Sequence, residues 1–277
     1  MDRYGFVDND ETTLSFSTST LTLTAATSYW RYMRQGIINY VSGDKTCDLT
    51  NTDGGTYYFY IDDDIGTLSC ATTAWTLADT KVCVAMVTYN STLTPDNLLQ
   101  DERHTCTIDR RDHRYNHLTR STQLVSGGAL SGYTLATATE AGVTWGVAEA
   151  LIADEDLFHT LAALSDGNGS GTPYGVFYRT AASTWAWKLS DVPYDYTTSG
   201  YINYDSSGTQ TVASGTNKYI NYWFAYTNIT GDFRFITIPG RAEYSTAAAA
   251  YAEDVRNYTW GGLPTAEFCI AYQITFV

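Results

Sequence analysis

The feature that most constrains this fold is a two-residue alternation of apolar and polar side chains in short runs. Leu14 and Phe16 alternate with Ser and Thr before an STST sequence, and residues 21–23 repeat the pattern after it. Because successive side chains of a strand point to opposite faces, this spacing predicts a hairpin with one apolar face. Residues 29–34 and 37–41 predict a second hairpin, since the glycine between them can adopt the positive φ of a tight turn.

The same signature continues along the chain. Residues 81–89, KVCVAMVTY, carry apolar side chains on both faces, which predicts a central strand covered from both sides. The abundance of Tyr, Thr and Gly also favours strands over helices. Further predicted strands cover residues 57–61, 67–70, 174–179, 184–189, 201–204, 218–226, 233–238 and 268–276.

Two segments interrupt this pattern with predicted helices. Residues 112–120 form a short helix with Asp112 as its N-cap, and residues 245–258 form a second helix capped by Ser245. We therefore predict a mainly β fold with two β-sandwich or jelly-roll-like domains. The domains are an N-terminal β-domain at residues 1–100, a basic helical hub and linker at 101–132, and a C-terminal β-sandwich at 133–277, with the linker at residues 126–132.

The basic hub is the most unusual part of the charge distribution. Residues 103–120 carry a net charge of +3, whereas the rest of the chain must carry −17 to give the total of −14. Such a cationic segment is suited to an acidic surface, on its own chain or on a neighbouring subunit. The predicted subunit-contact residues are Arg103, Arg110, Arg111, Asp112, His113, Arg114, His117 and Arg120.

Composition excludes several classes of protein. A charge of −14 opposes binding to nucleic acid, because phosphates would be repelled. No apolar run approaches the roughly 18 residues that span a bilayer, so membrane insertion is not expected. The first ten residues lack the basic start and apolar core of a signal peptide, which predicts synthesis and assembly in a cytoplasm. The five cysteines show no C-x-x-C pair, and we expect buried thiols.

Several segments resemble a group of tailed-bacteriophage virion proteins. They are YWRYM, DERH, DHRYNHLTRSTQLVSGGALSGYTL, KYINYW, ITIPGRAEY and GGLPTAEFCIAYQITF. The resemblance extends over nearly the whole chain. The proteins resembled are tail-fibre, receptor-binding and virion-surface proteins. It implies a non-enzymatic structural protein at the particle surface, located in the virion and assembled into a homo-oligomer, most simply a trimer, with other virion proteins.

Two patterns have features of a metal site. His113 and His117 have the spacing of two metal ligands on one helix face, but an ordinary interface helix has the same spacing, and we predict no metal there and no cofactor. The loop DGNGSG begins like a calcium loop with Asp166, Asn168 and Ser170, yet it lacks the closing Glu and is also a good hairpin turn. We therefore expect chelators to leave stability unchanged.

Acidic triplets at residues 62–64 and 154–156 could supply the acid and base of a glycosidase. Solvated turns are the simpler interpretation, so no catalytic residue is assigned. Exposed aromatic rings are the usual platform for sugars, and the predicted glycan-binding residues are Tyr58, Tyr60, Trp185, Trp187, Tyr194 and Tyr196. The function predicted is a tail-fibre or receptor-binding protein that contacts host surface polysaccharide. The alternatives are a capsid decoration or cement protein and, third, a polysaccharide-degrading adhesin.

Overall fold

The chain forms two compact units. The computed structural model describes residues 3–49, 51, 54–76, 80–135, 143–165, 174–182, 184–196, 201–215, 217–260, 263 and 267–277, with residues 110, 114, 118, 132–135 and 143–144 by their backbone only. The first unit comprises Met1–Ser121, Ala153–Phe158 and Asn228–Thr230, and the second comprises Thr122–Ile152, His159–Thr227 and Gly231–Val277.

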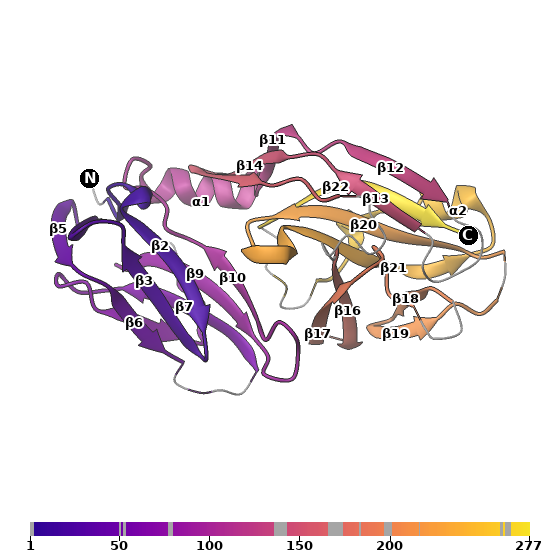
Figure 1. The fold of residues 1–277 in the computed structure, drawn as a ribbon, viewed down its shortest axis with the longest axis horizontal. Helices are drawn as coiled ribbons and strands as arrows, with labels where there is room; N and C mark the ends of the chain where they lie inside the picture. The colour runs from indigo at the N-terminus through magenta and orange to yellow at the C-terminus, as the bar shows by residue number, and fades with distance from the viewer. Residues whose placement is uncertain are drawn as a thin grey trace. The chain divides into compact units, whose positions relative to one another are not determined.

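The first unit contains three antiparallel sheets, α1 and a short 3-10 helix (Figure 1). In sheet order the strands are β1 (Gly5–Phe6), β4 (Tyr29–Arg34) and β5 (Ile37–Ser42); β2 (Thr12–Ser17), β3 (Thr20–Ala25) and β6 (Lys45–Asp48); and β10 (Asn97–Asp101), β9 (Val82–Tyr89), β7 (Gly55–Ile61) and β8 (Leu68–Ala71). The helices are η1 (Asn9–Glu11) and α1 (Arg110–Thr119).

Both predicted N-terminal hairpins are confirmed. Strands β2 and β3 pair with Leu14 opposite Leu23, and the chain reverses through Thr18 and Ser19 at φ of 51° and 66°. The β4–β5 hairpin turns at Gln35 and Gly36, also at positive φ. These primed-type turns match the right-handed twist of the strands they join. Strand β9 lies inside its sheet between β10 and β7, as its apolar sequence predicts.

A continuous core fills the first unit. It combines Leu21 and Leu23 of β3, Trp30 of β4, Phe59 of β7 and Val84 of β9, all without exposed surface. Side chains from all three sheets therefore share one apolar interior. Burying rings and branched chains of this size stabilises a fold by roughly 1.5–3 kcal/mol for each side chain.

The second unit is also built mainly from antiparallel strands. In sheet order they are β11 (Gln123–Gly127), β14 (Ala150–Asp154) and β15 (Leu157–Leu161); β12 (Leu130–Leu135) and β13 (Val143–Val147); β17 (Thr184–Ser190), β16 (Tyr174–Ala181), β21 (Phe235–Tyr244), β20 (Tyr219–Thr227) and β22 (Phe268–Phe276); and β18 (Asn203–Ser206) and β19 (Thr209–Val212). Its helices are η2 (Gly231–Arg234), α2 (Ala247–Tyr251) and η3 (Val255–Asn257). The adjoining ends of β14 and β15 fall within Ala153–Phe158 and belong to the first unit.

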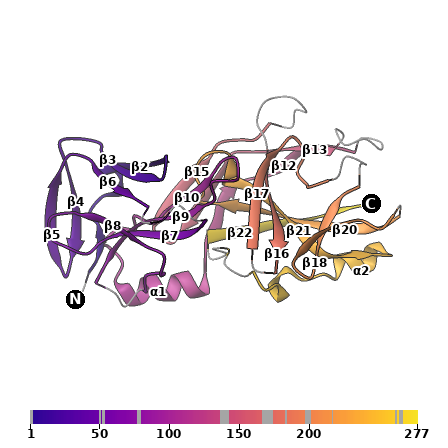
Figure 2. The same cartoon turned by 90° about the horizontal axis from the view of Figure 1, so that it is seen from below.

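The five-stranded sheet organises this unit, and Figure 2 shows its strands β16 and β17 paired. Pairing is antiparallel except between β16 and β21, which run parallel. Trp145, Tyr222, Phe224 and Tyr226 form the centre of its core. The C-terminal strand β22 belongs to this sheet as predicted, although it lies at the edge beside β20. The mainly β fold class is confirmed.

Three local predictions need correction. Helix α1 begins two residues earlier than predicted, because the Asp109 carboxylate, and not Asp112, accepts the first free amides. Helix α2 is capped by Thr246 instead of Ser245, and it ends at Tyr251 instead of continuing to residue 258, since η3 is a separate 3-10 helix. Residues 126–132 are not a linker, since they lie in β11, β12 and the turn between them, and the division between the units follows Ser121. In the described part of the chain, no helix has the length and apolarity to cross a membrane.

Candidate functional site

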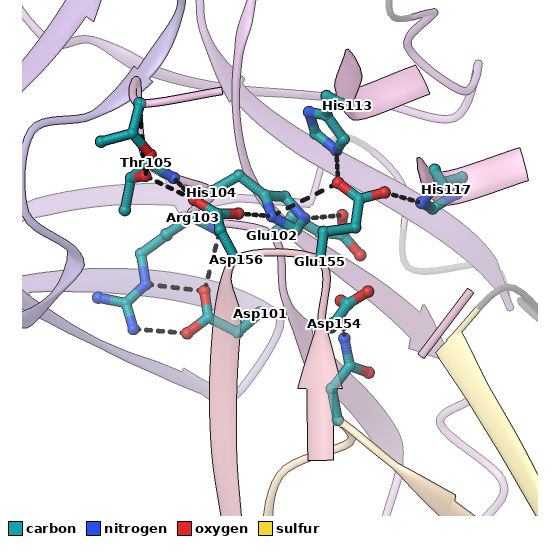
Figure 3. A network of polar contacts seen from close by, with 12 residues as sticks. Asp101, Glu102, Arg103, His104, Thr105, His113, His117, Asp154, Glu155 and Asp156 are labelled. Atoms are coloured by element: carbon teal, nitrogen blue, oxygen red, sulfur yellow. Dashed lines mark hydrogen bonds and ion pairs between the residues drawn. The ribbon is translucent and has the colours of Figure 1, made fainter. Parts of the chain in front are cut away.

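Three histidines and several carboxylates of the first unit converge on one point (Figure 3). Three chain segments supply them: the residues after β10, helix α1, and the turn between β14 and β15. We call this the histidine–carboxylate cluster, and it consists of Glu102, His104, His113, His117, Glu155 and Asp156.

Backbone hydrogen bonds fix the segment that carries His104. The Glu102 amide donates to the Val84 carbonyl at 3.1 Å, and the Phe6 amide donates to the His104 carbonyl at 2.9 Å. Strand β1 can approach so closely only because residue 5 is glycine, since a Cβ there would lie 2.6 Å from the His104 carbonyl oxygen. The position of His104 is therefore set by neighbouring strands.

Helix α1 presents the other two histidines. The Asp109 carboxylate accepts hydrogen bonds from the amides of Arg111 and Asp112 at 2.8 and 3.1 Å, which starts the helix. His113 and His117 then lie one turn apart on the same face. Both side chains reach the same carboxylate, that of Glu155.

Glu155 occupies a strained turn. Its φ is 55°, in the left-handed region that non-glycine residues seldom adopt. Its side chain is only 1% exposed. Unusual backbone geometry of this kind costs about 1–3 kcal/mol and persists where the surroundings determine it. Here it directs a buried carboxylate at two imidazoles.

The contacts within the cluster are short. Oε2 of Glu155 lies 2.8 Å from Nε2 of His113, and Oε1 lies 3.3 Å from Nδ1 of His117. His104 uses Nδ1 to contact Oδ1 of Asp156 at 2.6 Å. The other Asp156 oxygen accepts from the amide of Thr105 at 2.7 Å and from its hydroxyl at 2.5 Å. Asp156 thus fixes the orientation of the His104 ring.

These contacts shift the pKa values of the partners in opposite directions. Burial acts to raise the pKa of Glu155, but His113 and His117 outweigh it and lower that pKa to about 2. Burial likewise opposes the effect of His104 on Asp156, whose pKa falls to about 2. The contact with Glu155 raises the pKa of His117. Burial lowers the pKa of His104, but Asp156 and Glu102 raise it well above its ordinary value.

Some atoms at the centre of the cluster have no hydrogen-bond partner. They are Nε2 of His104 and both side-chain oxygens of Glu155, which lie near imidazole nitrogens without hydrogen-bond alignment. Each is almost fully buried, where an unpaired polar atom is costly. A pocket lined by Tyr4, Lys81, Glu102, His104 and His113 among others opens beside these atoms.

The structure places the predicted subunit-contact residues in different environments. Arg103 is buried and pairs with Asp101 at 2.6 Å, so its charge is used within the chain. His113 and His117 face Glu155, whereas Arg111, Asp112 and Arg120 are exposed. Of Arg110 and Arg114 the structure describes the backbone alone. Part of the hub therefore meets acidic groups of its own chain.

The hypothesis of a glycan platform needs correction at three residues. Trp185, Trp187 and Tyr194 are at most 8% exposed. The two tryptophans lie in β17, and Tyr194 follows that strand and packs against the rings of Tyr222 and Phe276. Buried rings cannot stack on a sugar. Tyr58, Tyr60 and Tyr196 are half-buried. The ring of Tyr58 packs against Trp75, the ring of Tyr60 against the ammonium group of Lys81, and the ring of Tyr196 against Tyr194.

The acidic segments also have defined places. Asp63 accepts amide hydrogen bonds from Ile65 and Thr67 in a turn, and Asp64 pairs with Arg34. Asp154 accepts from Asn228 at 3.0 Å. The predicted calcium loop, with Asp166, Asn168 and Ser170, lies outside the described residues.

The sequence patterns gave no prediction that His104, His113 and Glu155 meet. His113 and His117 are visible as a helical pair, but their partner lies in the acidic triplet at 154–156, which has no local relation to them. The available signal was the gathering of three of four histidines within residues 103–120.

No family model, curated protein or solved structure matches this chain.

Proposed function

We propose that this chain is a non-catalytic structural protein at the surface of a tailed-phage virion, of the tail-fibre or receptor-binding kind, that works as an oligomer. The resemblance of segments such as ITIPGRAEY and KYINYW to such proteins supports the class. The observation that carries the assembly role is an exposed apolar face on the β4–β5 hairpin of the first unit.

This face follows from the register of the hairpin. Met33 lies opposite Ile38, and Arg31 lies opposite Tyr40, so these side chains share one side of the sheet with Tyr29. Tyr40 is 67% exposed, Tyr29 48% and Ile38 43%. The rings of Tyr29 and Tyr40 lie 6.0 Å apart. Strand β5 is also the edge of its sheet.

An exposed apolar edge is a liability for an isolated protein, because it offers unpaired backbone groups together with apolar surface. Proteins that assemble use such surfaces, and aromatic residues are enriched at the centres of interfaces. The exposed residues Arg111, Asp112 and Arg120 of the hub supply a second polar surface for a neighbouring subunit or virion protein. Contact of the assembled protein with host polysaccharide is part of the same proposal.

Two measurements test this function. Antibody labelling of particles in the electron microscope should place gold at the tail tip, and gold over the head would favour a decoration protein.

Sedimentation of the purified wild-type chain should give an oligomer, and the double variant Ile38→Ser/Tyr40→Ser should sediment as a monomer. Tyr251→Ser, which removes an equally exposed ring from the second unit, is the matched control. A wild-type monomer at micromolar concentration would contradict the assembly role, and turnover of host polysaccharide would contradict the non-catalytic role.

A further inference from the structure

We propose that His104, His113 and Glu155 form a binding site for a divalent transition metal of the Zn²⁺ type. Each of the three residues offers one ligand atom, and these atoms all lie within 4.8 Å of one another. Figure 3 shows the three side chains pointing toward a common centre from separate segments of the first unit. This site goes beyond the virion role proposed above and does not depend on it. It departs from the expectation, drawn from sequence spacing alone, that His113 binds no metal and that chelators leave stability unchanged.

The distances suit a metal with short bonds. Tetrahedral zinc with bonds of about 2.0–2.1 Å holds its ligand atoms about 3.3 Å apart. Nε2 of His113 and Oε2 of Glu155 are separated by 2.8 Å, and the whole set stays within 4.8 Å. Small side-chain rotations therefore bring the three atoms to bonding distance without movement of the backbone.

Hydrogen bonding determines which nitrogen of His104 is available. Nδ1 lies 4.0 Å from Oε2 of Glu155 but is held by Asp156 at 2.6 Å. Nε2 has no hydrogen-bond partner and lies 3.8 Å from Oε2 of Glu102. We assign Nε2 as the metal ligand, because binding there leaves the contact with Asp156 in place. A histidine whose second nitrogen contacts a carboxylate is the usual arrangement for a metal ligand, since the carboxylate fixes the ring and increases its basicity. Both oxygens of Glu155 also lack hydrogen-bond donors while its side chain is 1% exposed.

The charge of the surroundings favours a cation. Four acidic side chains, Glu102, Asp154, Glu155 and Asp156, gather around the imidazoles, and each is buried or nearly so. The guanidinium of Arg103 does not offset them, because it pairs with Asp101 and donates to Thr12. A bound divalent ion would take over the compensation of this negative charge from the imidazoles that pair with Glu155 and Asp156.

The donor set selects the kind of metal. Two imidazole nitrogens and one carboxylate suit Zn²⁺ and neighbouring transition metals, whereas Ca²⁺ and Mg²⁺ require mainly oxygen ligands. The pocket lined by His104 and His113 borders two of the three ligands. With three protein ligands, tetrahedral coordination would leave the fourth position to water. His117, which contacts Glu155 at 3.3 Å, acts as a positioning residue for that carboxylate.

The test uses the full-length chain stripped with EDTA and dialysed into metal-free buffer. Titration with ZnCl₂ in a calorimeter should give one ion per chain with a dissociation constant of micromolar or below. Zinc should raise the melting temperature by at least about 4 °C, because an ion that binds only the folded state stabilises it. Co²⁺ should give the visible absorption of a four-coordinate site, which reports the ligands directly.

Matched variants locate the site. His113→Gln and Glu155→Gln should weaken zinc binding more than tenfold, whereas His159→Gln, which changes the histidine outside the cluster, should leave it unchanged. Circular dichroism checks that each variant is folded. The cobalt spectrum of the wild-type protein tests the site even if a variant fails to fold. Absence of saturable zinc binding would overturn the proposal. So would equal binding by wild type, His113→Gln and Glu155→Gln, or a preference for Ca²⁺ or Mg²⁺ over Zn²⁺.

Discussion

Each unit buries a cluster of charges, and the two clusters are built from different cations. In the second unit Asp205, 1% exposed, lies between two arginines, 3.4 Å from Nη1 of Arg179 and 3.1 Å from Nε of Arg241. In the first unit the cationic partners of Glu155 and Asp156 are histidines. We call the former the arginine–aspartate cluster, and it consists of Arg179, Asp205 and Arg241.

The arginine–aspartate cluster is suited to a purely structural role. Its guanidinium groups also donate to the carbonyls of Ala182 and Thr259, and Arg241 stacks on the ring of Tyr258 with 4.5 Å to the centroid. Guanidinium has no lone pair for a metal and stays charged at every ordinary pH. Imidazole has both a lone pair and a proton that it can lose. Both clusters contain a buried carboxylate oxygen without a hydrogen-bond partner, at Asp205 and at Glu155. They differ in the cation, because only the histidine–carboxylate cluster adds imidazole nitrogens that can serve as metal ligands.

The largest expected effect is at Asp205. Asp205→Ala should reduce the free energy of unfolding by about 3–5 kcal/mol, because the buried guanidinium of Arg179 and the partly buried guanidinium of Arg241 lose their shared carboxylate. Urea denaturation measures the change, and Asp191→Ala, at an exposed position of the same unit, should stay within about 0.5 kcal/mol of wild type. Zinc binding should be unchanged in both variants. A loss below about 1 kcal/mol for Asp205→Ala would show that the cluster does not stabilise this unit.

The fold was predictable where the determinants are local. Gly36 occupies a turn that its own sequence favours, and β9 is apolar at successive positions because both its faces are covered. Thr18 and Ser19 adopt positive φ against their own preference, and the alternation of the flanking strands is what located that hairpin. The burial of Trp185 and Trp187 was not predictable, since alternation assigns one face to the interior without showing that the other is covered too.

The candidate site was predictable only in part. The i, i+4 spacing placed His113 and His117 on one helix face, which the structure confirms by their contact with the same carboxylate. His104 and Glu155 are 51 positions apart in the sequence, and no periodicity links them. They meet because the turn between β14 and β15, which carries Glu155, belongs to the first unit, and only the three-dimensional fold determines this.

A second, smaller effect on stability is expected at Asp156. Unlike a change at Asp205, a change at Asp156 should also weaken zinc binding. Asp156→Asn keeps the shape of the side chain but removes the charge that holds Nδ1 of His104. The affinity for zinc should fall roughly 10–100-fold, as is common when a carboxylate behind a metal-bound histidine is lost. The free energy of unfolding of the metal-free protein should fall by about 1–3 kcal/mol. Competition with a chromophoric chelator measures the first quantity and urea denaturation the second. Unchanged zinc affinity together with lower stability would assign Asp156 a structural role only, like that of Asp205.

The smallest effect is expected at Asp109, whose carboxylate starts the helix that carries His113. Hydrogen bonds from the amides of Asp112 and Arg111 lower the pKa of Asp109 below its ordinary value. Because the folded-state pKa is the lower one, this cap stabilises the helix above the ordinary aspartate pKa of about 3.9, and its contribution is lost as the pH falls through the folded-state value. In Asp109→Ala at neutral pH, amide hydrogen exchange at Arg111 and Asp112 should accelerate roughly fivefold. Asp109→Asn should retain slow exchange, because asparagine caps equally well, and it should abolish the acid dependence. Exchange rates by NMR between pH 2 and 6 measure both effects. Equal rates in wild type and Asp109→Ala would mean that contacts of His113 and His117 with Glu155, and not the cap, hold the first turn of α1.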